Sequence, residues 1–169
     1  MEIYVLVPVQ KSFVKQFFGY LCLALAIGSM LLACINPLMI LPLCIFGVVG
    51  YCLTFSGKKE FEYSYFDGDV RFAKVMNKSR RKNLASYTME EVMQIAPAGD
   101  RSVYKYETDS SIKAIDYTSH KKGVPFYVMA INKNGKMSMI KFEPDDRLLD
   151  AMMVKYASKV VRRPAVVQQ

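Results

Sequence analysis

Hydrophobic positions divide the chain into an uncharged apolar stretch and a charged region with alternating apolar residues. Residues 16–57 are 42 consecutive positions without Asp, Glu, Lys or Arg. A helix needs about 20 mostly apolar residues to cross a bilayer. Residues 17–35 and 38–55 each supply nearly that length, and the helix-breaking pair Asn36 and Pro37 separates them. The sequence therefore predicts two transmembrane helices joined as a hairpin.

Basic residues flank the two predicted spans but are missing from the turn between them. Lys11 and Lys15 precede the first span, and Lys58 and Lys59 follow the second. Since cytoplasmic flanks carry the excess of Lys and Arg, both termini are expected in the cytoplasm. Residues 1–16 are then a short cytoplasmic N-terminal segment, and the protein is a multi-pass protein of the inner (plasma) membrane.

Small residues on the two spans permit close helix packing, although such residues occur in any membrane helix. They are Gly28, Ser29, Ala33, Gly47 and Gly50.

An alternative interpretation of the first span is a lipoprotein signal. Lys11 and Lys15, the apolar run and the residues 31–34 have the order of such a signal, with Cys34 as the lipidated residue. A second apolar segment begins four residues later, and an exported lipoprotein has no evident use for it. The hairpin is therefore favoured.

Residues 58–163 show the alternation expected of strands. Aromatic and polar residues alternate over 60–66, and the turn pair Asp67-Gly68 follows. The segments 124–131 and 136–142 predict two strands joined around Asn134-Gly135. Met137 and Met139 lie on one face of the second of these strands and Ile140 and Phe142 on the other, which leaves the buried face undecided. Residues 101–111 are polar and predict a long connection.

An amphipathic helix is predicted to end the domain. Pro144 suits its first position, and Asp145 and Asp146 suit the positive end of the helix dipole, which explains these carboxylates without a metal. An apolar stripe marks its buried face: Leu148, Leu149, Met152, Tyr156 and Val160. Residues 164–169 are expected to be a frayed tail. The predicted fold class is α+β, a transmembrane helical hairpin followed by a mostly antiparallel domain with a C-terminal amphipathic helix.

The residue composition of this domain excludes several kinds of metal and catalytic site. All four cysteines, at positions 22, 34, 44 and 52, lie in the apolar stretch, and the one histidine is His120. A tetrahedral zinc site of Cys and His is therefore excluded from the domain. No phosphate-binding loop or hydrolase motif is present, so we expect no cofactor, no metal, no catalytic residues and no enzymatic activity.

The densest positive run lies at residues 78–82. A plain explanation is a solvated turn, and a functional one is contact with anionic lipid headgroups, because the predicted spans tether the domain beside a membrane. The candidate lipid-binding residues are Lys58, Lys59, Lys78, Arg80, Arg81 and Lys82. Nucleic acid is a poorer partner because no helix-turn-helix signal or extended basic face is present.

The order of strands followed by one helix is that of a pleckstrin-homology-like (PH-like) barrel, and other α+β arrangements fit the same order. The chain resembles a clostridial family of uncharacterised two-span membrane proteins with a bacterial PH-like domain. The resembling segments are residues 61–65 (FEYSY) with Asp67-Gly68-Asp69, 74–82 (KVMNKSRRK), 95–97 (IAP) and 142–144 (FEP). This resemblance implies the topology and the fold but carries over no catalytic residues. The acidic residues Asp67 and Asp69 in the first predicted hairpin turn disfavour phosphoinositide binding there.

Three functional hypotheses follow. The first is a membrane-anchored, non-catalytic interaction module that binds a protein partner at the inner membrane surface. The second is recognition of anionic lipid by the basic residues, as a membrane-surface or envelope-stress sensor. A transporter is the weakest of the three, because two spans without an ionisable residue offer no pathway for an ion.

Overall fold

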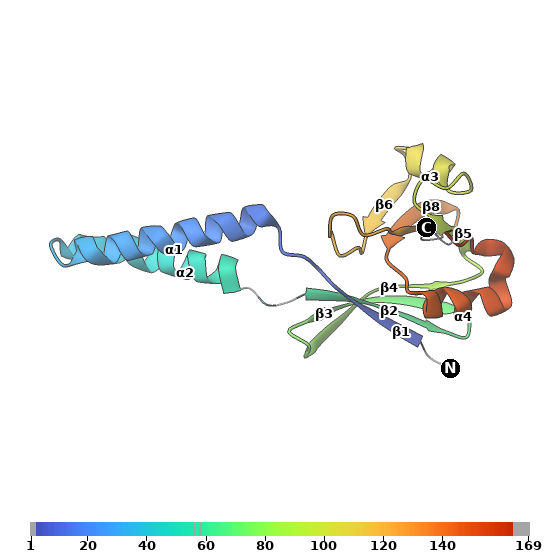
Figure 1. The fold of residues 1–169 in the computed structure, drawn as a ribbon, viewed down its shortest axis with the longest axis horizontal. Helices are drawn as coiled ribbons and strands as arrows, with labels where there is room; N and C mark the ends of the chain where they lie inside the picture. The colour runs from blue at the N-terminus through green and yellow to red at the C-terminus, as the bar shows by residue number, and fades with distance from the viewer. Residues whose placement is uncertain (1–2, 56, 58, 164–169) are drawn as a thin grey trace, which may run out of the picture. The chain divides into compact units, whose positions relative to one another are not determined.

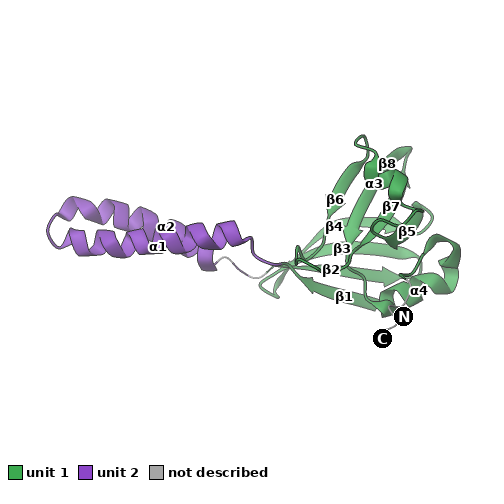
Figure 2. Ribbon diagram, turned by 45° about the horizontal axis from the view of Figure 1, so that its top comes forward, with its two compact units in different colours: residues 1–9, 59–169 green, residues 10–58 purple. Residues whose placement is uncertain are grey.

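The protein is described here by a computed structural model, which covers residues 3–55, 57 and 59–163. The chain divides into two compact units, which Figure 2 shows in different colours. One unit contains residues 1–9 and 59–169, and the other contains residues 10–58. The N-terminal residues therefore belong to the same unit as the long C-terminal region.

The first sheet of the larger unit is a four-stranded antiparallel meander in the order β1-β2-β3-β4. Its strands are β1 (Ile3–Pro8), β2 (Lys59–Phe66), β3 (Asp69–Met76) and β4 (Arg80–Thr88). Residues 1–16 were predicted to be a short segment outside the domain, and this prediction is wrong, because β1 pairs with β2 over its whole length. The larger unit therefore includes residues before position 58.

The second sheet has the order β5-β7-β8-β6. It contains β5 (Val92–Pro97), β6 (Lys113–Asp116), β7 (Tyr127–Lys133) and β8 (Lys136–Phe142). Only the pairing of β6 with β8 is parallel. A short helix, α3 (Tyr104–Thr108), precedes β6 within the segment that was predicted to be a long connection (Figure 1). The connection is therefore partly helical, and it places Tyr106 in a buried position.

Two hairpins of this unit turn through the predicted residue pairs, and these residues have positive φ. Asp67 (φ 45°) and Gly68 (φ 95°) connect β2 to β3, and Asn134 (φ 53°) and Gly135 (φ 76°) connect β7 to β8. Positive φ at both central positions favours the tight turns that match the twist of paired strands. Both predicted turn pairs are therefore confirmed.

The main core lies between the two sheets and the C-terminal helix α4 (Asp146–Tyr156). Tyr63 and Phe72 of the first sheet are fully buried, and the ring of Tyr63 lies edge-on to that of Phe142 at 5.7 Å. Leu148 and Met152 of the predicted apolar stripe are also buried in this core. The C-terminal amphipathic helix is thus confirmed as the element that packs against both sheets.

The helix begins two residues later than predicted. Asp145 is its N-cap, and the carboxylate of Asp145 accepts a hydrogen bond from the Leu148 amide at 2.9 Å. Pro144 lies before this cap and not at the first helical position. The helix ends at Tyr156, and a 3-10 turn η2 (Ala157–Lys159) follows. The Val161 amide then donates to the carbonyl of Ile95 in β5.

The smaller unit is a helical hairpin of α1 (Phe13–Ala33), the 3-10 turn η1 (Pro37–Met39) and α2 (Ile40–Phe55). The first helix begins four residues before the predicted span. Asn36 caps the turn, since its side chain accepts from the Leu38 amide at 3.0 Å. Both helices are long and apolar enough to be candidate membrane spans, and most of their side chains are exposed in the hairpin, which is consistent with a membrane protein.

Close packing of the two helices depends on Gly19 and Gly50. A Cβ atom at Gly50 would lie 2.9 Å from Cγ of Leu23, and one at Gly19 would contact the side chain of Thr54. By contrast, nothing lies within 4 Å of a Cβ atom at Gly28 or Gly47. Of the predicted small residues, Gly50 therefore lies in the helix interface, whereas Gly28 and Gly47 face away from it.

Candidate functional site

Strand register gathers basic residues from three strands at one end of the first sheet. Lys59 of β2 lies opposite Met76 of β3, which lies opposite Arg80 of β4. In the next row, Lys74 of β3 lies opposite Lys82 of β4. Directly opposed residues project their side chains to the same face of a sheet. The four cations therefore share one face.

We call this group, together with the turn residue Lys78, the basic end: Lys59, Lys74, Lys78, Arg80 and Lys82. Lys78 occupies the β3–β4 turn with φ 56° and is exposed, as are Lys59, Arg80 and Lys82. Within the part of the chain that the structure describes, no carboxylate lies within 4.0 Å of any of these five side chains. Their charge is therefore not neutralised by internal ion pairs.

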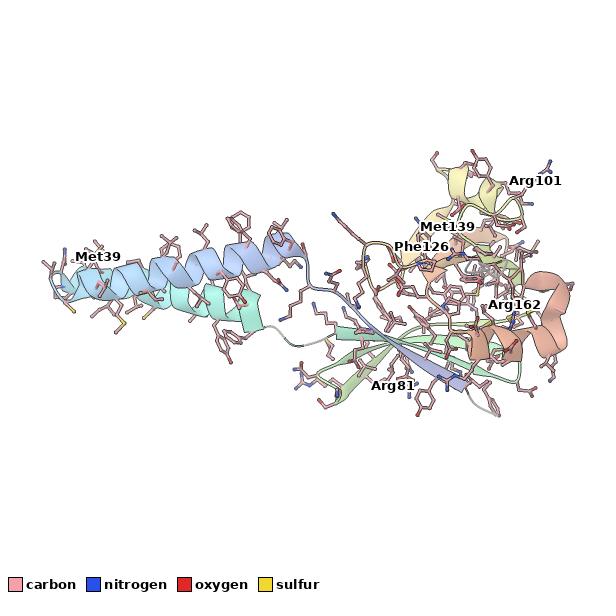
Figure 3. The ribbon with its side chains drawn as sticks, viewed as in Figure 1. Met39, Arg81, Arg101, Phe126, Met139 and Arg162 are labelled. Atoms are coloured by element: carbon pink, nitrogen blue, oxygen red, sulfur yellow. The ribbon has the colours of Figure 1, made fainter. Side chains whose placement is uncertain are left out.

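Arg81, another predicted lipid-binding residue, belongs to the opposite face. It lies opposite Val75 in the register and forms an ion pair with Glu62 of β2. Figure 3 shows Arg81 on the side of this sheet that faces away from the second sheet. Arg81 is thus separated from the other candidates, and Lys58 lies outside the described residues.

An aromatic group borders the basic end on the inner face of the sheet. Phe61 occupies the same row as Lys74 and Lys82. Its ring centroid lies 5.3 Å from that of Tyr117, which in turn lies 5.1 Å from that of Phe72. The partly exposed ring of Phe61 therefore places an apolar surface beside the cations.

A polar cluster follows β6, but its hydrogen bonds are structural. The Ser119 amide and hydroxyl both donate to Oε1 of Glu143, at 3.0 and 2.9 Å, and this fixes the segment after β6. His120 is exposed, and its Nδ1 lies 3.7 Å from Oδ2 of Asp116 and 3.4 Å from Oγ1 of Thr118. Because the serine hydroxyl binds a carboxylate and not the imidazole, this is not the arrangement of a nucleophile with its base.

The two acidic residues considered for metal binding have a structural role. The Asp145 carboxylate caps α4 and also contacts Nε of Arg147 at 3.1 Å. Asp146 lies in the first helical turn. Among the described residues, no group of three or more His, Cys, Asp or Glu side chains is placed to hold a metal ion.

Two four-stranded sheets with a C-terminal helix packed against them confirm the predicted fold class, a mostly antiparallel domain that ends in an amphipathic helix. Over residues 1–162 the chain matches the family described as Bacterial PH-like domain (DUF6106). The chain belongs to this family. No curated protein and no solved structure matches the chain.

The family match includes β1 and the helical hairpin, so the hairpin is an insertion between the first two strands of the PH-like domain. The clostridial origin of the resembling proteins stays a prediction. Lys74 is the member of the basic end that the sequence analysis missed. The sequence shows that Lys74 shares a strand face with Phe72, two residues before it. It does not show that Lys74 lies beside Phe61 and Lys82, because this depends on the pairing of β3 with β2 and β4.

Proposed function

We propose that this PH-like protein is a membrane-anchored, non-catalytic module whose basic end docks on anionic lipid headgroups. The observation that supports the proposal is the strand register that brings Lys59, Lys74, Arg80 and Lys82 to one face of one sheet end. Each Lys or Arg near an anionic membrane surface contributes about 1 kcal/mol to its attraction. Five cations without internal carboxylate partners are the expected composition of such a surface.

Chain connectivity also supports the proposal. In the sequence, Lys59 follows the last helical residue, Phe55, by four positions, and Pro8 precedes Phe13 by five. A residue extends the chain by at most about 3.6 Å. If the hairpin spans a bilayer, short tethers connect it to this end of the first sheet.

Pairing of β1 with β2 supports a topology with both flanks on one side of the membrane. The two strands lie on either side of the hairpin in sequence and form one antiparallel ladder from Ile3 to Pro8. Two spans between them satisfy this condition, because an even number of crossings returns the chain to its starting side. The flanking lysines support a cytoplasmic location for this side, next to the inner membrane.

The test uses the full-length protein in nanodiscs, with the four native cysteines replaced and an environment-sensitive dye on Ser79→Cys in the β3–β4 turn. We expect the dye emission to shift on changing from phosphatidylcholine to discs containing phosphatidylserine. The shift should disappear at about 1 M salt, where the Debye length is about 3 Å. The variant Lys74→Glu/Arg80→Glu/Lys82→Glu should also abolish it.

A dye on Ser158→Cys, in the exposed turn after α4, is the matched control and should report no difference between the two lipids. A shift at position 79 that is equal in neutral and anionic discs, or that survives the triple charge reversal, contradicts headgroup recognition by the basic end.

A second candidate function, the binding of a protein partner, is favoured by a different surface. An open cleft lies beside α3 on the second sheet, with lysines at its rim.

A further inference from the structure

The cleft beside α3 is lined by apolar side chains from three elements. Met93 of β5, Tyr106 of α3 and Met137 of β8 contribute to its wall, together with Ile112, and its volume is about 710 Å³. Met93 is 46% exposed, although four of the six residues of β5 are buried. The cleft therefore presents an accessible apolar surface within a folded unit.

This surface exists because the second sheet is apolar on both faces. Val128, Ala130 and Met139 turn away from the main core and form a second apolar cluster with Tyr106. Figure 3 shows Met139 on the part of this sheet that lies near α3. The five-residue helix α3 covers part of the outer face. Met93, Ile112 and Met137 lie beside the area that α3 covers, and they line the cleft.

Three lysines at the rim give the cleft a positive charge. Lys105, Lys113 and Lys136 line it and are exposed. In residues 3–55, 57 and 59–163, no carboxylate is within 4.0 Å of these three side chains. Lys105 instead lies over the ring of Tyr106, with Nζ 4.7 Å from the centroid.

The one acidic residue in the lining, Asp109, is engaged locally. Its Oδ1 accepts from the amide and the hydroxyl of Ser111, at 2.9 and 2.7 Å. These hydrogen bonds lower the pKa of Asp109 below its usual value. The Asp109 carboxylate therefore stabilises the loop between α3 and β6. The three rim lysines can then bind an external anion.

Strand β6 gives the cleft an elongated border. It is an edge strand of the second sheet and is four residues long, and Lys113 at its start lines the cleft. Edge strands are common docking sites for extended peptides, with pockets beside them that receive alternate side chains. The cleft is open to solvent and extends from Met93 of β5 to Lys113 of β6, which suits a chain segment better than an enclosed small molecule.

We propose that this cleft binds an extended acidic segment of a protein partner, with an apolar side chain of that segment inserted between Met93 and Met137. The apolar lining accounts for the inserted side chain, and the three rim lysines account for acidic flanking residues. The site lies on the second sheet and does not depend on the basic end of the first sheet.

The experiment measures fluorescence anisotropy of a short labelled peptide of alternating glutamate and leucine with the full-length protein in neutral detergent micelles. We expect saturable binding, and none of the matching peptide of alternating lysine and leucine. The variant Lys105→Glu/Lys113→Glu/Lys136→Glu should weaken binding by about tenfold or more, because each exposed charge pair is worth a few tenths to 1 kcal/mol and reversal adds repulsion.

The matched control is Lys78→Glu/Arg80→Glu/Lys82→Glu, which makes the same change in net charge at the basic end. It should change peptide affinity by less than about threefold at physiological salt, where the Debye length is about 8 Å. The exposed Met93→Ser should weaken binding by about threefold or more through lost apolar contact. Equal melting temperatures of all variants show that they are folded.

Three results would overturn the proposal. One is equal binding of the glutamate and lysine peptides. Another is unchanged affinity of the variant that reverses Lys105, Lys113 and Lys136. The third is that the same variant binds the peptide normally but no longer associates with phosphatidylserine vesicles. This result would identify the cleft as a lipid-binding site.

Discussion

The hydroxyl of Tyr63 in β2 donates a hydrogen bond of 2.5 Å to the carbonyl of Tyr117, which follows β6. This bond connects the first sheet to the segment that leaves the second sheet. The Tyr63 side chain is fully buried, and its ring packs edge-on against Phe72 and Phe142. Loss of the hydroxyl leaves the carbonyl without this donor while the ring packing is retained.

We therefore predict that Tyr63→Phe lowers the free energy of unfolding by about 1–3 kcal/mol, the usual cost of a buried group that loses its hydrogen bond. Thermal or denaturant unfolding in detergent measures this. Tyr4→Phe is the control, because Tyr4 is 65% exposed and should show almost no change. Equal stabilities of the two variants would show that the Tyr63 hydrogen bond contributes nothing.

The same residue predicts how stability depends on alkaline pH. Burial raises the pKa of Tyr63 above the ordinary value of tyrosine. Below pH about 10 the residue is protonated in both states, so its contribution is fully present. Above that pH the unfolded state ionises first, and the free energy of unfolding falls. Between about pH 9 and 11, Tyr63→Phe should lose less stability than the wild type, and an equal loss would contradict the assignment.

Packing of the helical hairpin predicts opposite tolerance at two glycines of α2. Gly50→Ala places a Cβ atom 2.9 Å from Cγ and 3.0 Å from the backbone nitrogen of Leu23, and the helices must separate. We expect a loss of about 1–3 kcal/mol in hairpin stability, as for other overpacked sites. Gly47→Ala meets nothing within 4 Å and should be neutral. Thermal unfolding in detergent, followed by circular dichroism, should separate the two variants.

The N-terminus of α4 predicts different losses of stability for alanine substitutions at two adjacent carboxylates. Asp145→Ala removes the carboxylate that accepts from the Leu148 amide, at a cost of about 1 kcal/mol. Asp146→Ala, one residue later, removes only the interaction of an exposed charge with the helix dipole and should cost a few tenths of that amount. A larger loss at Asp146 than at Asp145, measured by urea unfolding, would contradict the assigned cap.

Membrane topology predicts a labelling pattern in intact cells. In a background without the native cysteines, an impermeant thiol reagent should label Asn36→Cys in the hairpin turn and leave Ser110→Cys unlabelled. Permeabilisation should then make Ser110→Cys reactive, because its side chain is exposed in the folded domain. Labelling of position 110 in intact cells would reverse the proposed orientation.

Local signals in the sequence predicted the elements whose partners are close in the chain. Asn134-Gly135 predicted the hairpin of β7 and β8, and the spacing of Leu148, Leu149 and Met152 predicted the buried face of α4. The burial of Met139 and Ile140 in β8 was undecided, because Met139 packs under α3 while Ile140 packs in the main core. Two buried faces give no contrast between polar and apolar positions.

Features that depend on distant partners were predicted only in part. Strand β1 pairs with residues beyond the hairpin, and its outward side chains Tyr4 and Leu6 are apolar although exposed, so the segment lacks a polar face. The basic end was found in part, because residues 78–82 are adjacent in sequence. Only the strand register shows that Lys74 lies beside these residues. The same register shows that Arg81 lies on the opposite face of the sheet.

The insertion of the hairpin between β1 and β2 has a consequence for biosynthesis. Residues 3–8 leave the ribosome before the hairpin, but the strand that pairs with them begins only at Lys59, after the hairpin has been made. Closing a long flexible loop costs entropy, and a hairpin of docked helices brings the ends of that loop together in advance. The first sheet can therefore be completed only after both helices have been synthesised, and until then β1 has no partner strand.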